Sequence, residues 1–398
     1  MHGIKSPLPS GWTMKTLGET LEYVQYGLSM PAFEQGTYPM FRMSNFENGL
    51  VTDNNLVYVE LSDNEASKFL LEKGDILFNR TNSAALVGKT GIFLLPGEFV
   101  FASYLIRLRV NREVAHPEYI NYVLNDPSIK QLLARLATPG ASQCNINPTT
   151  LQAKVVFPLP LLAEQKRIAD TLQAWDDALA LQNRKLLQLR KRKDGIAQGL
   201  LSQHKRMPGF SRAARLVKAG SIFLPVSKRG HEQEELLSVT QDKGVLPRSM
   251  LEGRVVMPEG TTAGYKLVES GNFVISLRSF QGGLEYSEYR GLVSPAYTVL
   301  ESTPQVVPDF YKHYFKSADF VQRLSSAVIG IRDGKQISFK DFSIINIPHP
   351  DPAEQRAIAE VLNTADAEIR LEEQKLTALR NQKRGLLHQL LTGQLRLS

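Results

Sequence analysis

The sequence AEQKRIADTLQAWDDALALQNRKLLQLRKRKDGIAQGLLSQ, residues 163–203, occurs twice in this chain in related form. Its first three residues, Ala163-Glu164-Gln165, return 190 positions later (353 − 163) as Ala353-Glu354-Gln355. The register then continues without a gap, and it matches Ile168 with Ile358, Leu172 with Leu362, Asp176 with Asp366, Leu181 with Leu371, Lys185-Leu186 with Lys375-Leu376, Leu189-Arg190 with Leu379-Arg380, Lys193 with Lys383, Gly195 with Gly385 and Leu200-Leu201 with Leu390-Leu391. A repeat of this length predicts two similar units in one chain.

The spacing of the apolar residues predicts that each copy is a long helix. Apolar side chains recur at alternating steps of four and three, which is the heptad pattern of a coiled-coil seam. The predicted seam residues are Ile168, Leu172, Leu179, Leu186 and Leu189 in the first copy and Ile358, Leu362, Ile369, Leu376 and Leu379 in the second. At ~1.5 Å per residue each helix would be ~60 Å long, which is too long for burial against one compact domain.

Polar residues interrupt the two seams at matching positions. Gln182 in the first copy corresponds to Glu372 in the second, and Lys193 corresponds to Lys383. Polar residues in a seam cost stability but fix its register and its partner. The simpler interpretation is a pair of separate amphipathic core helices. The matched interruptions favour a coiled coil that the two helices form with each other.

Composition narrows the class of protein. The single cysteine, Cys144, excludes a disulfide framework and any cysteine-based zinc site, and the seven histidines show no ligand spacing, so no metal site is predicted. No N-terminal apolar run or membrane-spanning stretch is found, and we expect a cytoplasmic protein. The net charge of +7 allows nucleic acid as a partner. Residues 1–160, however, carry 13 Lys and Arg against 14 Asp and Glu, which argues against binding DNA by charge alone.

The regions before the two helices run through the same order of elements. Residues 1–160 are predicted as a mixed, strand-rich domain, with a turn, strand and polar loop at 73–83, an alternating strand at 99–110, a helical region at 116–136, a polar loop at 141–148 and then a strand that leads to the prolines at 158 and 160. Residues 207–350 repeat this order with different loop sequences, and the corresponding helical region is predicted at 309–324. We therefore predict four segments, at 1–160, 161–206, 207–350 and 351–398.

Two local patterns resemble catalytic motifs but are interpreted otherwise. Gly88-Lys89-Thr90 is close to a phosphate-binding loop, but Ser83 stands where the first glycine belongs. Glu164-Gln165-Lys166 and Glu373-Gln374-Lys375 have a nuclease-like E-x-K form, yet both lie in the predicted helices, where such residues are usually a solvated charged face. We predict no catalytic residue, no metal and no cofactor, so any catalysis would come from a partner.

Several short stretches together resemble the specificity subunit of a type I restriction–modification system. They are GDILFNRTNS with LVGKTGIF at 74–93, YKLVESGNFVIS with GLVSPAYTVL at 265–300, and LLTGQLRL at 390–397. To these are added the prolines at 158 and 160 and at 348 and 350, each pair followed by a predicted helix that begins with Ala-Glu-Gln. The resemblance implies a DNA-binding subunit without enzymatic activity. It implies two target-recognition domains, each reading one half of a split double-stranded DNA sequence. It also implies two long helices that hold two methyltransferase (modification) subunits and, in the restricting complex, motor–nuclease subunits.

The repeat agrees with that resemblance. Two similar units suggest a pseudo-twofold axis, and an axis perpendicular to the helices makes them antiparallel. The expected fold class is therefore α+β, with two similar mixed domains, each followed by a long helix, and an antiparallel coiled coil. One turn of DNA is ~34–36 Å long, so two half-sites about a turn apart lie within the reach of a ~60 Å helix.

Loop chemistry gives the candidate DNA contacts. Arg, Lys, Asn and Gln read base edges in the major groove, and the predicted loops at 79–83, 142–147, 278–281 and 332–336 are rich in them. The candidates are Arg42, Asn79, Arg80, Asn82, Ser142, Gln143 and Asn145 in the first domain and Arg278, Gln281, Arg332, Lys335 and Gln336 in the second. Each of them could instead be a surface residue that stabilises its own turn. The alternative function is a coiled-coil scaffold that joins two protein-binding modules.

Overall fold

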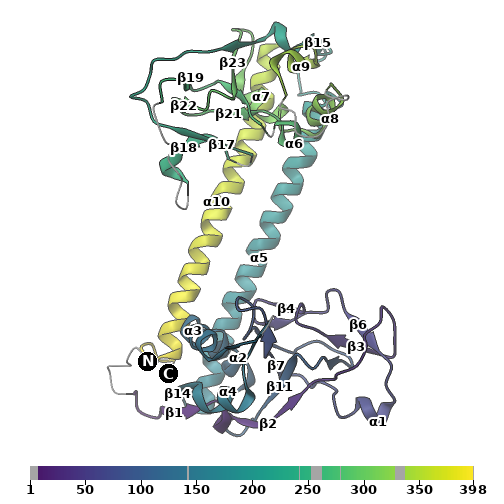
Figure 1. Cartoon of the computed structure of the whole chain (residues 1–398), viewed down its shortest axis with the longest axis vertical. Helices are drawn as coiled ribbons and strands as arrows, with labels where there is room; N and C mark the ends of the chain where they lie inside the picture. The colour runs from purple at the N-terminus through teal and green to yellow at the C-terminus, as the bar shows by residue number, and fades with distance from the viewer. Residues whose placement is uncertain are drawn as a thin grey trace. The chain divides into compact units, whose positions relative to one another are not determined.

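A computed structural model describes residues 8–140, 143–241, 243–251, 262–277, 279–327 and 337–397, without the side chains of Phe280, Gln281 and Ala327. The chain divides into two compact units, one of Met1–Leu181 with Leu376–Ser398 and one of Gln182–Lys375. Figure 1 shows the elements of each unit. The two long helices, α5 (Leu162–Leu201) and α10 (Pro352–Leu391), have 40 residues each, and each contributes one segment to each unit.

The remaining elements of the first unit are mostly short strands. They are β1 (Thr13–Thr16), η1 (Gly18–Thr20), β2 (Leu21–Tyr26), β3 (Tyr38–Phe41), β4 (Phe46–Glu47), β5 (Leu50–Val51), β6 (Val57–Val59), α1 (Asp63–Ala66), β7 (Ile76–Asn79), β8 (Thr81–Asn82), β9 (Thr90–Ile92), β10 (Val100–Phe101), β11 (Leu105–Val110), α2 (Pro117–Asn125), α3 (Pro127–Leu136), β12 (Thr138–Pro139), β13 (Cys144–Asn145), α4 (Pro148–Lys154) and β14 (Val156–Leu159).

The second unit has a similar series. Its elements are β15 (Arg215–Lys218), η2 (Ala219–Ser221), β16 (Phe223–Val226), β17 (Leu237–Thr240), β18 (Gly244–Pro247), η3 (Arg248–Met250), β19 (Lys266–Val268), β20 (Phe273–Ile275), α6 (Ser279–Gly282), β21 (Glu285–Tyr286), β22 (Gly291–Val293), β23 (Thr298–Ser302), α7 (Pro308–Tyr314), α8 (Ala318–Ala327), α9 (Phe339–Ser343) and β24 (Asn346–His349).

Sheet order confirms that the two mixed domains are similar. The first unit contains a run of strands in the order β2-β11-β7-β9, and the second unit contains the corresponding run β16-β23-β20-β21. Both runs are antiparallel throughout. The entry strand of each domain pairs with the strand that precedes its long helix, as β1 with β14 and as β15 with β24. The predicted fold class is therefore confirmed, with unlike loops on a repeated framework.

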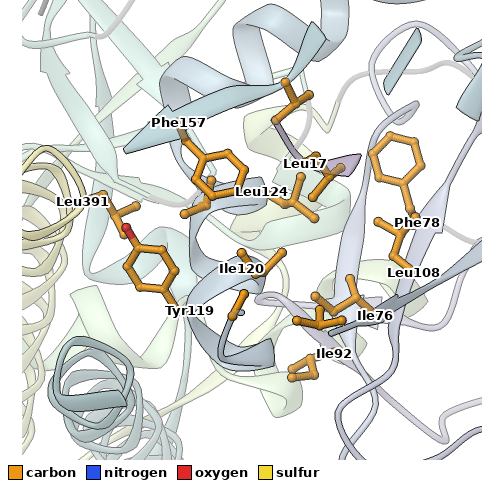
Figure 2. Close-up of a cluster of buried hydrophobic side chains, with 14 of the residues drawn as sticks. Leu17, Ile76, Phe78, Ile92, Leu108, Tyr119, Ile120, Leu124, Phe157 and Leu391 are labelled. Atoms are coloured by element: carbon orange, nitrogen blue, oxygen red, sulfur yellow. The ribbon is translucent and has the colours of Figure 1, made fainter. Parts of the chain in front are cut away.

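Each domain core receives the same four side chains from the long helices. Ile168 and Leu172 of α5 pack into the core of the first unit with Leu390 and Leu391 of α10. Figure 2 shows Leu391 beside Tyr119 of α2 in this cluster. The equivalent residues, Ile358, Leu362, Leu200 and Leu201, pack into the core of the second unit. The helices are thus part of both cores, and burial of each such side chain contributes roughly 1.5–3 kcal/mol.

Within each unit the two helices run antiparallel. In the second unit Arg206 pairs with Glu354 and Lys193 pairs with Asp366, so the residue numbers fall along one helix as they rise along the other. In the first unit the equivalent pairs are Glu164 with Arg396 and Asp176 with Lys383. There the acidic residues lie on α5, whereas in the second unit they lie on α10.

The polar interruptions of the two seams have partners on the opposite helix. Gln182 donates from Nε2 to Oε2 of Glu372 at 2.6 Å. Lys193 and Lys383 donate to Asp366 and Asp176, each at 2.5 Å. The ten predicted seam residues are all buried or half-buried.

Three parts of the first unit differ from the sequence-based expectation. The region 99–110 is two strands, β10 and β11. β11 is buried on both faces except at Arg109, because Ile106, Leu108 and Val110 pack in one core cluster and Leu105 packs in another. The region 141–148 is not wholly a loop, since β13 pairs with both β12 and β8. A helix, α4, follows at Pro148, where a strand was expected. In the second unit the helical region at 309–324 is two helices, α7 and α8.

Candidate DNA interface

The best-described candidate site lies in the first unit, where Arg80 links the ends of β7 and β8. The backbone of Arg80 is held on both sides, because its N–H donates to the carbonyl of Tyr104 at 3.1 Å and its carbonyl accepts from Ile146 N–H at 2.9 Å. This places the segment 102–104, which precedes β11, and the end of the β13 hairpin next to one arginine. The predicted loops 79–83 and 142–147 therefore meet in the folded domain.

The guanidinium of Arg80 has three neighbours. Its Nη1 donates to Oδ1 of Asn145 at 3.1 Å, and its Nε lies 3.4 Å from the carbonyl oxygen of Ser103. Its Cζ lies 4.8 Å from the centroid of the Tyr26 ring, a cation–π distance. The side chain of Arg80 is half-buried, whereas Tyr26 and Tyr104 are 50% and 47% exposed. The guanidinium of Arg80 is therefore held against the exposed ring of Tyr26, and its side chain stays partly open to solvent.

A glycine brings Tyr26 into this position. Gly27 follows Tyr26 directly, and a Cβ at Gly27 would lie 2.3 Å from the carbonyl oxygen of Ala102. Only glycine allows the backbones to approach this closely. Leu28 N–H then donates to the carbonyl of Phe101 at 2.8 Å, which fixes the segment after β2 against the end of β10. Tyr26 was not predicted as a site residue, and its place beside Arg80 depends on this pairing of distant segments.

The other predicted residues of the first domain fall into two groups. Arg42, Gln143 and Asn145 are exposed, and Arg42 lies next to Phe41, whose carbonyl accepts from Ala102 N–H at 3.0 Å. Asn79 and Asn82 are buried, with exposed fractions of 0% and 9%. Asn82 accepts from the N–H of Ser83 and so stabilises its own turn. The proposed DNA contacts of Asn79 and Asn82 do not fit this structure, because Asn79 is fully buried and Asn82 is nearly so.

The remaining predicted DNA contacts cannot be placed. Ser142, Arg278, Arg332, Lys335 and Gln336 lie outside the described residues, as does the side chain of Gln281. The backbone of Gln281 belongs to α6, a short helix where a loop was expected.

The two E-x-K patterns have structural roles. Glu164 is 4% exposed and accepts from Nε and Nη2 of Arg396 at 2.6 and 2.8 Å, and it also accepts from the indole N–H of Trp12 at 3.1 Å. Burial alone would raise the pKa of the Glu164 carboxyl, but these donors hold it below its usual value. The interpretation of Glu164 as part of a solvated face was therefore wrong. Glu373 is half-buried and pairs with Arg190.

The described residues form no cluster of metal ligands and no membrane-spanning helix. In the part of the chain that the structure describes, no three His, Cys, Asp or Glu residues gather as metal ligands could. No helix among the described residues is both long and apolar enough to cross a membrane.

The sequence belongs to a recognised family. The model of the type I restriction modification DNA specificity domain matches residues 9–191 and 259–381, which is more than half of the chain. This chain is therefore a member of that family, a specificity subunit of the type I restriction–modification class that recognises DNA sequence.

Individual relatives agree along nearly the whole chain. The MjaX specificity subunit of Methanocaldococcus jannaschii is 26% identical, over 98% of this chain and 95% of its own length. The MjaVIII specificity subunit of the same organism is 22% identical, over 100% and 95%. The EcoKI specificity subunit of Escherichia coli is 29% identical, over 46% of this chain and 40% of its own.

Solved structures support the fold. The S subunit of a type I system from M. genitalium has a TM-score of 0.59 at 19% identity, and the match covers 98% of both chains. A chain from a study of complex assembly in the type I system has a TM-score of 0.61 at 18% identity, covering 98% of this chain and 100% of that one. Family membership favours DNA recognition over the alternative of a scaffold for protein-binding modules.

Proposed function

We propose that this chain reads a two-part double-stranded DNA target, with one half-site for each target-recognition domain. The observation that carries this proposal is the repetition of the whole unit, a mixed domain followed by a 40-residue helix. The framework strands recur in the same order while the loops differ. This arrangement is expected of a protein whose two similar domains bind two different DNA half-sites.

The paired helices would hold the catalytic partners of the complex. These partners are two methyltransferase (modification) subunits and, when the complex restricts DNA, motor–nuclease subunits. The helices suit this role because both of their ends are fixed in the domain cores. We infer that the chain itself transfers no methyl group and cleaves no DNA. The purified chain, supplied with the methyl donor and shown to lack partner subunits, should give no methylation. Methyl transfer under these conditions would contradict this part of the proposal.

We propose Arg80 as a DNA contact of the first domain. Replacement Arg80→Ala, assembled with the modification subunits, should relax one base position in one half-site. If Arg80 contacts a base edge with two hydrogen bonds, the loss is about 1–3 kcal/mol at that position. The measurement is mapping of the methylated bases in genomic DNA.

A charge-matched control separates base reading from simple attraction. Arg135→Ala removes the same charge from an exposed position on α3. It should leave the methylated sequence unchanged. If both variants keep the original sequence and only weaken binding, with a smaller dependence on salt, Arg80 contacts phosphate and reads no base.

A further inference from the structure

We propose that Arg80, Asn145 and Tyr26 form a reader of a guanine edge, in which Asn145 and Tyr26 position the guanidinium of Arg80. This inference rests on the proposed function of the chain as a DNA reader and deepens it by naming the base. It depends on which hydrogen-bonding atoms of the three residues are already engaged within the domain.

Asn145 has no acceptor left for a base. Its Oδ1 accepts from Nη1 of Arg80 at 3.1 Å and from Oγ1 of Thr81 at 3.3 Å, and an amide oxygen has two lone pairs. An asparagine reads adenine through one acceptor and one donor at once, contacting N6 and N7. With Oδ1 occupied, Asn145 cannot recognise adenine in this way. Only its Nδ2 group, a donor, has no partner among the described residues.

Arg80 also offers only donors. A guanidinium has five N–H groups, and those of Arg80 that are engaged are Nε toward the Ser103 carbonyl and one N–H of Nη1 toward Asn145. Among the described residues no partner is present for Nη2. The free edge therefore presents neighbouring N–H groups and no acceptor. In the major groove, guanine presents two neighbouring acceptors, O6 and N7, and adenine replaces one of them with an amino donor. The donor edge of Arg80 therefore matches guanine and is repelled by adenine.

The positioning comes from two different elements. Asn145 lies on β13, whose pairing with Thr81–Asn82 of β8 places the amide beside the guanidinium. Tyr26 ends β2 and lies 4.8 Å from Cζ of Arg80, which restricts the plane of the guanidinium. A side chain held in this way loses less conformational freedom when it binds a base, so discrimination should depend on both neighbours.

The test is methylated-base mapping and competition binding of the assembled complex with a set of variants. The wild-type half-site read by the first domain should contain a G·C pair. In Arg80→Ala, discrimination at that pair should fall by roughly 5- to 150-fold. In Asn145→Ala it should fall at the same pair by roughly 2- to 10-fold, the worth of one hydrogen bond. In Tyr26→Ala the fall should be roughly 2- to 5-fold.

Conservative variants distinguish positioning from folding. Tyr26→Phe keeps the ring and should keep discrimination within about twofold of the wild type. Asn145→Asp keeps an acceptor for Arg80, so it should retain the preference for guanine even where the added charge weakens binding to all sequences. The half-site of the second domain is an internal control, because a complex that still reads it is folded and assembled.

The possible results separate the two levels of the proposal. If Arg80→Ala changes neither half-site in an assembled complex, Arg80 is no base contact, and the proposed role of Arg80 fails with the guanine reader. If Arg80→Ala relaxes a position that is not a G·C pair, the guanine assignment is wrong. If Arg80→Ala relaxes a G·C pair but Tyr26→Ala and Asn145→Ala leave that pair unchanged, Arg80 reads the base and the positioning roles are wrong.

Discussion

The glutamines of the repeated Ala-Glu-Gln stretch hold each domain to its long helix. Gln165 is fully buried, accepts from the backbone N–H of His116 at 2.8 Å and donates to the carbonyl of Pro160 at 2.9 Å. Gln355 makes the same two bonds in the second unit, with Val307 N–H and the Pro350 carbonyl, both at 2.8 Å. In both units the bonded N–H belongs to the residue just before a short helix, α2 or α7. Each glutamine, on its long helix, therefore caps the N-terminus of the neighbouring short helix.

Replacing Gln165 by Ala should destabilise the first unit by about 2–4 kcal/mol, because it removes hydrogen bonds to three backbone groups, those of His116, Pro160 and Val114, and leaves them without partners. Gln355→Ala should do the same in the second unit. Hydrogen exchange read separately over the two units should show faster exchange in the first unit for Gln165→Ala and in the second for Gln355→Ala. Unchanged exchange in both variants would mean that water replaces the glutamine without loss.

Two histidines, His313 in a buried position and His349 in a half-buried one, should make the second unit sensitive to acid. Burial lowers the pKa of His313, although a hydrogen bond to Asn363 and the charge of Asp366 act in the opposite direction; Lys193 and Lys312 lower it further. Burial also lowers the pKa of His349, with a smaller effect of Arg215 in the same direction. Because the unfolded chain then binds more protons than the folded one, stability is complete above pH ~6.5 and is lost as the pH falls from there.

We therefore expect the second unit to lose protection from hydrogen exchange between pH 7 and pH 5. The carboxylates whose pKa values are lowered titrate below this window, so they do not contribute within it. The variant His313→Gln with His349→Gln should be almost insensitive to pH over the same range. An equal loss in the variant and in the wild type would show that other groups cause it.

At the scale of elements, patterns within one segment were predictable and pairings between distant segments were not. The heptad spacing predicted both long helices, since the seam depends on local period alone. The predicted segments 161–206 and 351–398 begin one residue before α5 and α10 and end five and seven residues beyond them. The start of α4 also had a local signal that the prediction missed, because Asn147 caps the helix by accepting from the N–H groups of Thr149 and Thr150, and Pro148 follows it. By contrast, nothing near Cys144 indicates that its strand pairs with Asn82.

The residues of the candidate site were likewise predictable by type but not by exposure. Loop composition pointed to Arg80 and Asn145, and the fold places their side chains 3.1 Å apart. Composition also pointed to Asn79, but β7 lies between β11 and β9 and is buried along its length. Tyr26 could not be predicted as a site residue, because its place beside Arg80 depends on the packing of Gly27 against Ala102. A polar residue type is readable from sequence, whereas its exposure depends on strands elsewhere in the chain.

At the scale of the whole molecule, the proposed function makes the helices a spacer between the two reading domains. The two helices have equal length, their bounds differ by the same 190 residues as the repeat, and their seam interruptions pair with acidic residues at equivalent positions. A spacer of this kind would fix the distance between the half-sites. The distance should therefore change when both helices are lengthened by a whole number of heptads.

We predict that one heptad inserted after Leu189 of α5, together with one inserted after Arg370 of α10, lengthens the DNA spacer. Both helices are extended because each is anchored in both cores. Seven residues keep the seam continuous and add ~10 Å at ~1.5 Å per residue. At ~3.4 Å per base pair along one strand, the half-sites should move apart by roughly three base pairs. Methylated-base mapping after assembly with the modification subunits gives the new spacing directly. Insertions of two residues at the same places should rotate the seam residues away from each other and prevent assembly. If the heptad variant assembles and still methylates the original half-sites at the original spacing, the helices hold the partner subunits but do not measure the DNA.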